Sequence, residues 1–156
     1  MTGAVVVDKP QGWTSHDVVA KFRRISRTKK VGHLGTLDPM ATGVLPLVVG
    51  RATRLSQFYT KADKVYDATV RFGFSTSTYD AEGEPTSPGT DPEVDRDKLV
   101  ELLRQFEGEI DHLPPAVSAK KIGGVPAYKL ARQNVAVELT PVRVTVYGVE
   151  ILGCEG

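Results

Sequence analysis

The chain has 156 residues, of which 40% are hydrophobic and 25% charged, with a formal net charge of +1. These values are ordinary for a globular domain and exclude a chain that is disordered throughout. The single cysteine, Cys154, excludes an intramolecular disulfide framework, and the apolar run at residues 4–7 is too short for a signal peptide or a membrane span. We expect one soluble domain in the cytoplasm.

The first half of the chain predicts an alternation of strands and helices, and therefore an α+β fold. A short strand over residues 4–7 precedes a helix that begins after Thr14, because Thr14 and Asp17 have the spacing of a capping box. Residues 44–49 are apolar enough for a buried strand, although Pro46 would restrict its pairing. Residues 66–74 alternate between apolar and polar side chains, which predicts a half-buried strand with Tyr66 on its apolar face.

The second half shows weaker patterns. Residues 76–92 are rich in Ser, Thr, Gly, Pro and acidic side chains, which predicts a long surface loop. Leucines at helical spacing predict a helix over residues 99–106 that ends at Gly108. The remaining expectations are irregular structure over residues 114–126, one or two helical turns over 127–133, and a β-branched strand over 142–152.

One carboxylate, Asp38, stands within residues 32–46 among glycines, small hydroxyls and apolar side chains, with no Lys or Arg in the segment. A buried carboxylate in such surroundings needs hydrogen bonds or a cation from elsewhere, because burying an unpaired charge is costly. Asp followed by Pro39 also resembles the start of a helix, with Asp as the cap. His33 and glycines that allow sharp bends are more than a helix start needs, which favours a functional role for Asp38.

Six basic residues lie within residues 21–30, whereas the middle of the chain is acidic. Such a cluster either binds phosphates or forms a solvated helix face. The sequence has no cluster with metal-ligand spacing and no nucleotide-cofactor fingerprint, so we expect neither a metal nor a cofactor. The basic residues are Lys21, Arg23, Arg24, Arg27, Lys29 and Lys30.

Together these segments resemble the TruB family of bacterial tRNA pseudouridine-55 synthases. The family signature Gly-x-Leu-Asp-Pro-x-Ala-x-Gly-x-Leu is matched by residues 35–45, with Asp38 at the position of the catalytic Asp. Further motifs follow in the family's order. They are Asp-Lys-Pro-Gln-Gly-Trp-Thr-Ser at residues 8–15, Lys-Val-Tyr at 64–66, Thr-Ser-Thr-Tyr-Asp-Ala-Glu-Gly at 76–83, and the segments 114–121 and 128–132.

The resemblance implies roles for three residues. Asp38 would be the catalytic nucleophile, since a carboxylate can form a transient covalent adduct. Tyr66 would stack on the flipped base and help to remove the proton from C5, and His33 would take up the space that the base vacates in the RNA. The alternatives are a strand core residue for Tyr66 and a hydrogen-bonded loop histidine for His33.

Three further residues match motif positions that would face the substrate. Lys9 and Lys121 would be substrate-side cations, and the alternative for each is a surface lysine. Asp80 resembles a family acid near the target nucleotide, whereas its acidic loop equally suits a turn-forming Asp.

The resemblance implies an isomerase that converts the uridine at position 55 in the T-loop of tRNA into pseudouridine by base flipping. The expected partner is the T stem-loop of tRNA, and no membrane is involved. The alternative is a non-catalytic RNA-binding or assembly module. A glycosidase-like hydrolase is disfavoured, because no second carboxylate has a clear acid–base placement.

Family members continue with a Ser-x-Gly-Thr-Tyr-x-Arg segment, whose Arg pairs with the catalytic Asp, and with a small C-terminal RNA-binding domain. Neither occurs within residues 1–156. The chain is therefore expected to be the N-terminal portion of the catalytic domain, a mixed, mainly antiparallel sheet flanked by helices. We expect it to be inactive alone and to associate with the missing half or with its own copies.

Overall fold

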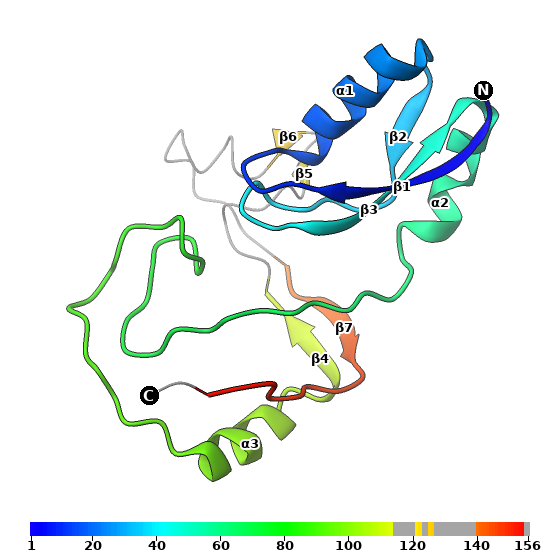
Figure 1. Cartoon of the computed structure of the whole chain (residues 1–156). Coiled ribbons are helices and arrows are strands. Elements are labelled where there is room, and N and C mark those ends of the chain that lie inside the picture. Colours follow the sequence, from blue (N-terminus) through cyan, green and yellow to red (C-terminus); the bar gives the residue numbers. More distant parts are fainter. Residues whose placement is uncertain (114–120, 123–124, 127–139, 155–156) are drawn as a thin grey trace. The chain divides into compact units, whose positions relative to one another are not determined.

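The structure is a computed structural model that describes residues 1–113, 121–122, 125–126 and 140–154. It contains helices and antiparallel sheets, which confirms the predicted α+β class (Figure 1). The chain divides into two compact units, residues 1–68 and residues 69–156. The Asp38 segment lies in the first unit.

The first unit contains a three-stranded antiparallel sheet in the order β1 (Gly3–Lys9), β3 (Gly43–Val49), β2 (Val31–His33). The two strands predicted over residues 4–7 and 44–49 are confirmed, and β2 was not predicted. Pro46 stands in the central strand opposite Val6. A proline has no N–H to donate, and the β2 ladder ends beside it, at the pair His33 and Leu47. Pro46 therefore restricts pairing on the β2 side only.

Helix α1 (Ser15–Ser26) covers one face of this sheet (Figure 1). The predicted capping box is confirmed: the Asp17 N–H donates to Thr14 Oγ1 at 3.1 Å, and the Thr14 N–H donates to Asp17 Oδ2 at 2.9 Å. The helix buries Val18 and Val19 against side chains of β2 and β3. These strand residues are Val31, Leu45, Leu47 and Val49.

A 3₁₀ helix, η1 (Gly50–Leu55), and a short helix, α2 (Ser56–Tyr59), follow β3, and neither was predicted. Gly50 turns the chain between β3 and η1 with a φ of +62°, and a Cβ at this position would collide with the carbonyl oxygen of Met1. Its N–H donates to the carbonyl oxygen of Lys30 at 2.7 Å. Glycine is required here because both the left-handed backbone and the close approach exclude a side chain.

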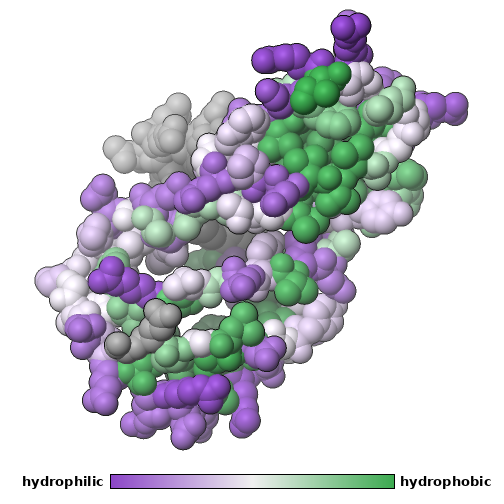
Figure 2. Space-filling model, viewed as in Figure 1, coloured by the Kyte–Doolittle hydropathy of each residue, from purple (hydrophilic) through white to green (hydrophobic). Residues whose placement is uncertain are grey.

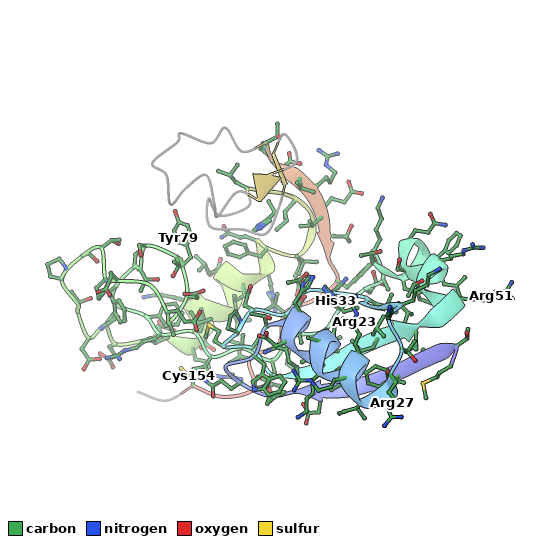
Figure 3. All side chains as sticks on the ribbon, turned by 90° about the horizontal axis from the view of Figure 1, so that it is seen from above. Arg23, Arg27, His33, Arg51, Tyr79 and Cys154 are labelled. Carbon is green, nitrogen blue, oxygen red and sulfur yellow. The ribbon has the colours of Figure 1, made fainter. Side chains whose placement is uncertain are left out.

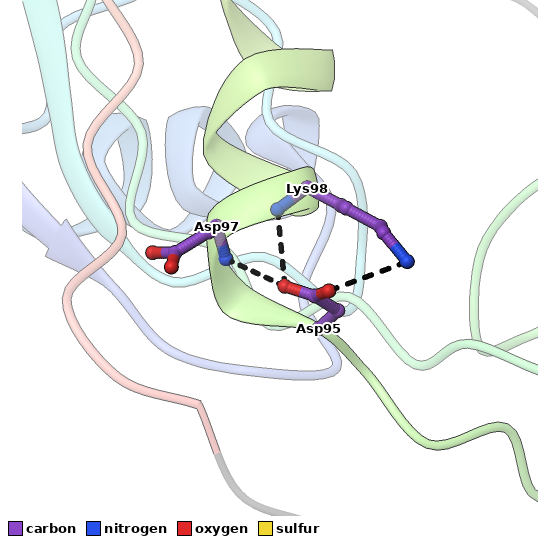
Figure 4. Close-up of polar contacts among 3 residues, drawn as sticks. All are labelled: Asp95, Asp97 and Lys98. Atoms are coloured by element: carbon purple, nitrogen blue, oxygen red, sulfur yellow. Dashed lines mark hydrogen bonds and ion pairs between the residues drawn. The ribbon is translucent and has the colours of Figure 1, made fainter.

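The second unit contains α3 (Arg96–Arg104) and two small antiparallel sheets, β4 (Gly108–His112) with β7 (Val142–Val146), and β5 (Lys121–Ile122) with β6 (Val125–Pro126). The helix predicted over residues 99–106 is present but begins and ends earlier. Asp95 caps its N-terminus, because the Asp95 Oδ1 accepts the N–H groups of Asp97 and Lys98 at 3.0 and 3.2 Å (Figure 4). The loop predicted over residues 76–92 is confirmed as mostly irregular.

Several predicted elements need correction. Residues 66–74 form no strand, because an alternating segment becomes a strand only by pairing, and no strand in the described part of the chain pairs with it. The last strand stops at Val146, where its partner β4 begins at Gly108 and the ladder runs out. Gly108 therefore starts a strand as well as following a helix. Residues 114–126 were expected to be irregular, yet β5 and β6 lie within them, and residues 127–133 lie outside the described residues.

Candidate active site

Asp38 lies on the turn that leads from β2 into β3. Residues 38–41 form this turn, in which the Ala41 N–H donates to the carbonyl oxygen of Asp38 at 3.1 Å. Pro39 occupies the second position, where its fixed φ favours the turn. No helix begins at Asp38, so its interpretation as a helix cap is wrong. The turn leaves the Asp38 side chain exposed.

The residues on both sides of Asp38 are held by the motif at residues 8–15. Ser15, which is buried at the start of α1, accepts the Leu37 N–H at 2.9 Å, and its hydroxyl lies 3.3 Å from the Leu37 carbonyl oxygen. The Gly12 N–H donates to the Pro39 carbonyl oxygen at 2.8 Å. The sequence placed Ser15 only at a helix start. Its position as the last residue of a motif was the signal that could have identified it as a positioning residue.

Lys9 lies beneath the same turn and is completely buried, so its alternative as a surface lysine is wrong. Its Nζ donates to three carbonyl oxygens, of Pro10 at 3.0 Å, of Trp13 at 2.5 Å and of Pro39 at 3.3 Å. Three acceptors satisfy the three N–H bonds of a lysine ammonium, and this compensates for its burial. Lys9 therefore joins the loop before α1 to the Asp38 turn.

The Asp38 carboxylate makes no hydrogen bond or ion pair to any residue that the structure describes. Solvent takes the place of the partners that a buried carboxylate would have required. The backbone is thus anchored on both sides of Asp38, while its carboxylate is open to a molecule outside the protein. A fixed backbone with an accessible carboxylate is the arrangement that a nucleophile needs.

His33, at the end of β2, is half-buried and held in one orientation. Its Nδ1 lies 2.6 Å from the carbonyl oxygen of Gly35, and because a carbonyl only accepts, Nδ1 is the donor. The ring also meets the ring of His16 edge to face, with 5.4 Å between centroids. The alternative for His33 was a hydrogen-bonded loop histidine: the hydrogen bond is present, but the residue ends a strand and does not lie in a loop. Its Nε2 has no assigned partner among the described residues.

Tyr66 is 69% exposed, so its alternative as a strand core residue is wrong. The motif that contains it approaches the Asp38 segment, because Lys64 Cε lies 3.7 Å from the place a Cβ on Gly35 would occupy. The Lys64 Nζ donates to the carbonyl oxygen of Ala62 at 2.7 Å, which fixes this turn of chain. The described contacts place Tyr66 in the first unit with Asp38 and leave its ring available.

Asp80 lies in the second unit, where it forms the turn that was its alternative. Its Oδ1 accepts the Thr78 hydroxyl at 2.6 Å and the Glu82 N–H at 3.0 Å. Tyr79, beside it, has a φ of +64° and an exposed ring. Lys121 is in β5, and its side chain lies outside the described part of the structure.

No group of three His, Cys, Asp or Glu side chains within the described ranges is arranged to hold a metal ion. No helix in the described portion has the length and apolar character to cross a membrane.

Two curated proteins match the chain over all or nearly all of its length. It is 60% identical over 156 residues to the tRNA pseudouridine synthase B of Solibacter usitatus and 49% identical over 154 residues to that of Aquifex aeolicus. These alignments cover 100% and 99% of the chain but 53% of each relative. The chain therefore spans about half the length of the curated relatives it matches.

Solved structures agree with the sequence comparison. A crystal structure of a Cbf5-Nop10-Gar1 complex matches 99% of this chain with a TM-score of 0.62 and 31% identity, over 36% of the matched chain. An H/ACA RNP bound to a substrate RNA containing 2'-deoxyuridine matches 70% of this chain with a TM-score of 0.50 and 33% identity. Residues 23–156 match the family model described as TruB family pseudouridylate synthase, N-terminal domain. The chain belongs to this family.

Proposed function

We propose that this chain supplies the nucleophile of an enzyme that isomerises a uridine of tRNA to pseudouridine, with Asp38 as that nucleophile. The observation that carries the proposal is the Asp38 turn, whose backbone is anchored at Leu37 and Pro39 while the carboxylate remains exposed and without a partner among the described residues. The names of the relatives favour this enzyme over a non-catalytic RNA-binding module.

The reaction needs no oxidant, reductant or external energy, because substrate and product are isomers. The bond between the sugar C1' and N1 of uracil breaks, the base turns, and a bond forms between C1' and C5. The proton on C5 then leaves, and N1 takes one up. Asp38 attacks either the sugar carbon or the base, and its carboxylate is regenerated when the product forms.

The target uridine has to leave the RNA stack to reach Asp38, at a cost of about a few kcal/mol. We propose that the exposed ring of Tyr66 stacks on the flipped base and that its hydroxyl helps to remove the C5 proton. His33, with its ring fixed by Gly35 and His16, would fill the vacated space in the RNA. The target is the T stem-loop at position 55, which places the enzyme in the cytoplasm with its tRNA.

The proposal also includes residues beyond these 156. The family's Ser-x-Gly-Thr-Tyr-x-Arg segment, whose Arg would pair with Asp38, does not occur in this sequence. An exposed carboxylate is a suitable partner for an Arg brought by such a segment, since the pair would form where Asp38 is now solvated. Asp80 and Lys121 remain proposed substrate contacts, whereas Lys9 is assigned a positioning role.

The test is Asp38→Asn in a longer protein, in which this chain is extended to the full length of its relatives. Asn has nearly the same shape but no comparable nucleophile, so pseudouridine formation in a tRNA transcript should be abolished, while tRNA affinity stays within about tenfold. Conversion is measured by mass spectrometry after carbodiimide labelling, and affinity by filter binding. Asp91→Asn, which removes an exposed carboxylate from the acidic loop, is the matched control and should retain activity. Substantial activity of Asp38→Asn would overturn the assignment.

A further inference from the structure

Two of the three histidines in the chain, His16 and His33, contact each other. His16 is the second residue of α1, and His33 is the last residue of β2. Their ring centroids lie 5.4 Å apart and the ring planes cross at 78°, which is the perpendicular arrangement that π-systems prefer. Figure 3 shows His33 next to α1. The helix and the strand are thus joined by a contact between two specific rings.

The stability of α1 does not explain why residue 16 is a histidine. The His16 side chain is exposed and lies outside the core, which α1 reaches through Val18 and Val19. The start of a helix carries a partial positive charge, so a cationic imidazolium is unfavourable there. The cap at this end is formed by Thr14 and Asp17. What a histidine provides at this position is an aromatic ring that reaches the end of β2.

The backbone that carries His16 is fixed by the residues on both sides of it. Ser15, directly before it, is buried and accepts the Leu37 N–H. Asp17, directly after it, closes the capping box with Thr14. Only the side-chain torsions of His16 remain to be set, so little further entropy is lost when its ring is placed against the partner ring.

Two contacts together fix the ring of His33. Its Nδ1 donates to the carbonyl oxygen of Gly35 at 2.6 Å, but a single hydrogen bond leaves a ring able to pivot about it. The His16 ring supplies a second contact, which limits this pivoting. The Nε2 atom has no assigned partner among the described residues, so this edge of the ring stays available to a bound molecule.

The first turn of α1 therefore holds both ends of the segment that leads to Asp38. His16 contacts His33 at the start of this segment, and the Ser15 hydroxyl accepts the Leu37 N–H at its end, at 2.9 Å. Because the two holding residues are neighbours on one helix, a single rigid element positions both the His33 ring and the backbone beside Asp38. Sites supported by helices are more precise than sites supported by loops.

We propose that His16 is a positioning residue, whose ring holds the ring of His33 at a fixed place relative to Asp38. This inference rests on the proposed function, in which the His33 ring fills the space that the flipped uridine leaves in the RNA. A ring that is already in place loses little entropy when it enters the RNA. His16 therefore speeds the flipping step and contributes little to tRNA affinity.

The test compares His16→Ala and His16→Phe in the longer protein. Alanine removes the ring, so single-turnover pseudouridine formation should fall by about tenfold while tRNA affinity stays within about threefold. Phenylalanine keeps an aromatic ring without the charge or hydrogen bonds of imidazole, and it should restore the rate to within about threefold of the wild type. His112→Ala, which removes the exposed histidine of β4 in the second unit, is the matched control and should change neither quantity.

Two spectroscopic measurements test the role of His16 without relying on turnover. With isotope-labelled histidine in the longer protein, a nuclear Overhauser effect should join the ring protons of His16 and His33, and the His33 signals should shift in His16→Ala. The thermal unfolding midpoint should not change, because His16 is exposed. A fluorescent purine analogue placed next to the target uridine reports unstacking, and its fluorescence rise should be about tenfold slower in His16→Ala.

The outcomes separate this inference from the proposed function. If the wild-type protein forms pseudouridine and His16→Ala forms it equally fast, or if His16→Phe is as slow as His16→Ala, only the positioning role is overturned. The absence of an Overhauser effect between the two rings in the wild type would overturn it as well. If the wild type forms no pseudouridine, but unstacking is slowed in His16→Ala and restored in His16→Phe, the positioning role stands and the proposed activity does not.

Discussion

The Ser15 hydroxyl contacts both the N–H and the carbonyl oxygen of Leu37, the residue before Asp38. Ser26 offers a comparison on the same helix, because its hydroxyl is buried and has no partner among the described residues. Two serines of one helix therefore differ in whether their hydroxyl supports the site. The difference can be measured directly.

Ser15→Ala should destabilise the Asp38 turn by about 1–2 kcal/mol, because the partly buried Leu37 N–H loses its acceptor. The smaller side chain frees the turn, so single-turnover pseudouridine formation should fall by about tenfold or more. Hydrogen exchange at the Leu37 amide measures the first effect. Ser26→Ala should change neither quantity. Unchanged Leu37 protection in Ser15→Ala would show that the Ser15 hydroxyl does not hold the turn.

Tyr66→Phe separates stacking from proton removal. Phe keeps the aromatic face but lacks the hydroxyl, so base entry should persist while the single-turnover rate falls by about a hundredfold. Tyr66→Ala should impair both. Tyr59→Phe, at another exposed tyrosine of the first unit, is the matched control. Full turnover by Tyr66→Phe would leave Tyr66 with a stacking role alone.

At the scale of elements, the two longer helices that the structure describes, α1 and α3, each have a polar N-terminal cap in which an aspartate carboxylate takes part. In α3, the backbone N–H of Lys98 lowers the pKa of the Asp95 carboxyl, and in α1 the hydroxyl of Thr14 lowers the pKa of the Asp17 carboxyl. A lowered pKa means that the ionised cap is bound more tightly in the folded state than in the unfolded chain. The Asp17 and Asp95 carboxyls therefore contribute more to helix stability when they are ionised than when they are protonated.

The pH dependence of the stability of α3 follows from the lowered pKa of Asp95. The contribution of Asp95 should be complete above the ordinary Asp value of 3.8 and be lost as the pH falls below it, through the lowered pKa. Hydrogen exchange at the Asp97 and Lys98 amides, measured over a pH series and corrected for intrinsic exchange, should show the loss. In Asp95→Asn, the amide caps the helix without titrating, and the loss should disappear. An equal loss in Asp95→Asn would assign the pH effect to other carboxylates.

Residues 66–74 show that an alternating pattern alone does not make a β-strand. Its alternation is that of a half-buried strand, yet Val70 and Phe72 are 69% and 41% exposed and no described strand pairs with it. Arg71 instead lies over the ring of Phe74, 5.3 Å from its centroid. Alternation of apolar and polar residues determines which side chains share a face. A β-ladder also needs a neighbouring strand, which the alternation does not provide.

At the scale of the whole molecule, one face of the first unit's sheet carries α1, and the opposite face leaves large apolar side chains open. Figure 2 shows apolar side chains gathered over β1 and β3. Val6 and Val44 on these strands are 68% and 72% exposed, and Phe58 in α2 is 70% exposed. An apolar surface of this kind usually has a partner.

Because of this apolar face, the 156-residue chain on its own should associate with its own copies as concentration rises. It should also form no pseudouridine in a tRNA stem-loop, because the Ser-x-Gly-Thr-Tyr-x-Arg segment does not occur in this sequence. Sedimentation over a concentration series and a turnover assay on the same sample measure both. Val6→Thr/Val44→Thr should reduce association, whereas Ile25→Thr, at an exposed position of α1, should not. A monodisperse, fully active monomer would contradict the prediction.

The local sequence determined those features whose causes lie within a few residues. The capping box of Thr14 and Asp17 and the apolar strands around Val5 and Leu47 follow from short patterns, and the family motif around Asp38 is a continuous stretch of chain. Their outcomes could be predicted because a cap joins residues three positions apart, and a strand needs only its own alternation to choose a face.

Tertiary structure alone decided the features that join distant segments. Lys9 is a motif residue by sequence, but only the fold shows that its ammonium is buried against the carbonyl oxygen of Pro39, 30 positions away. Arg23 and Arg51 likewise both line one cavity beside β2, because the pairing of β2 with β3 brings the start of η1 to the same side as α1. A charged side chain has no preferred burial or partner by itself, so its environment is set by whichever segments pack around it.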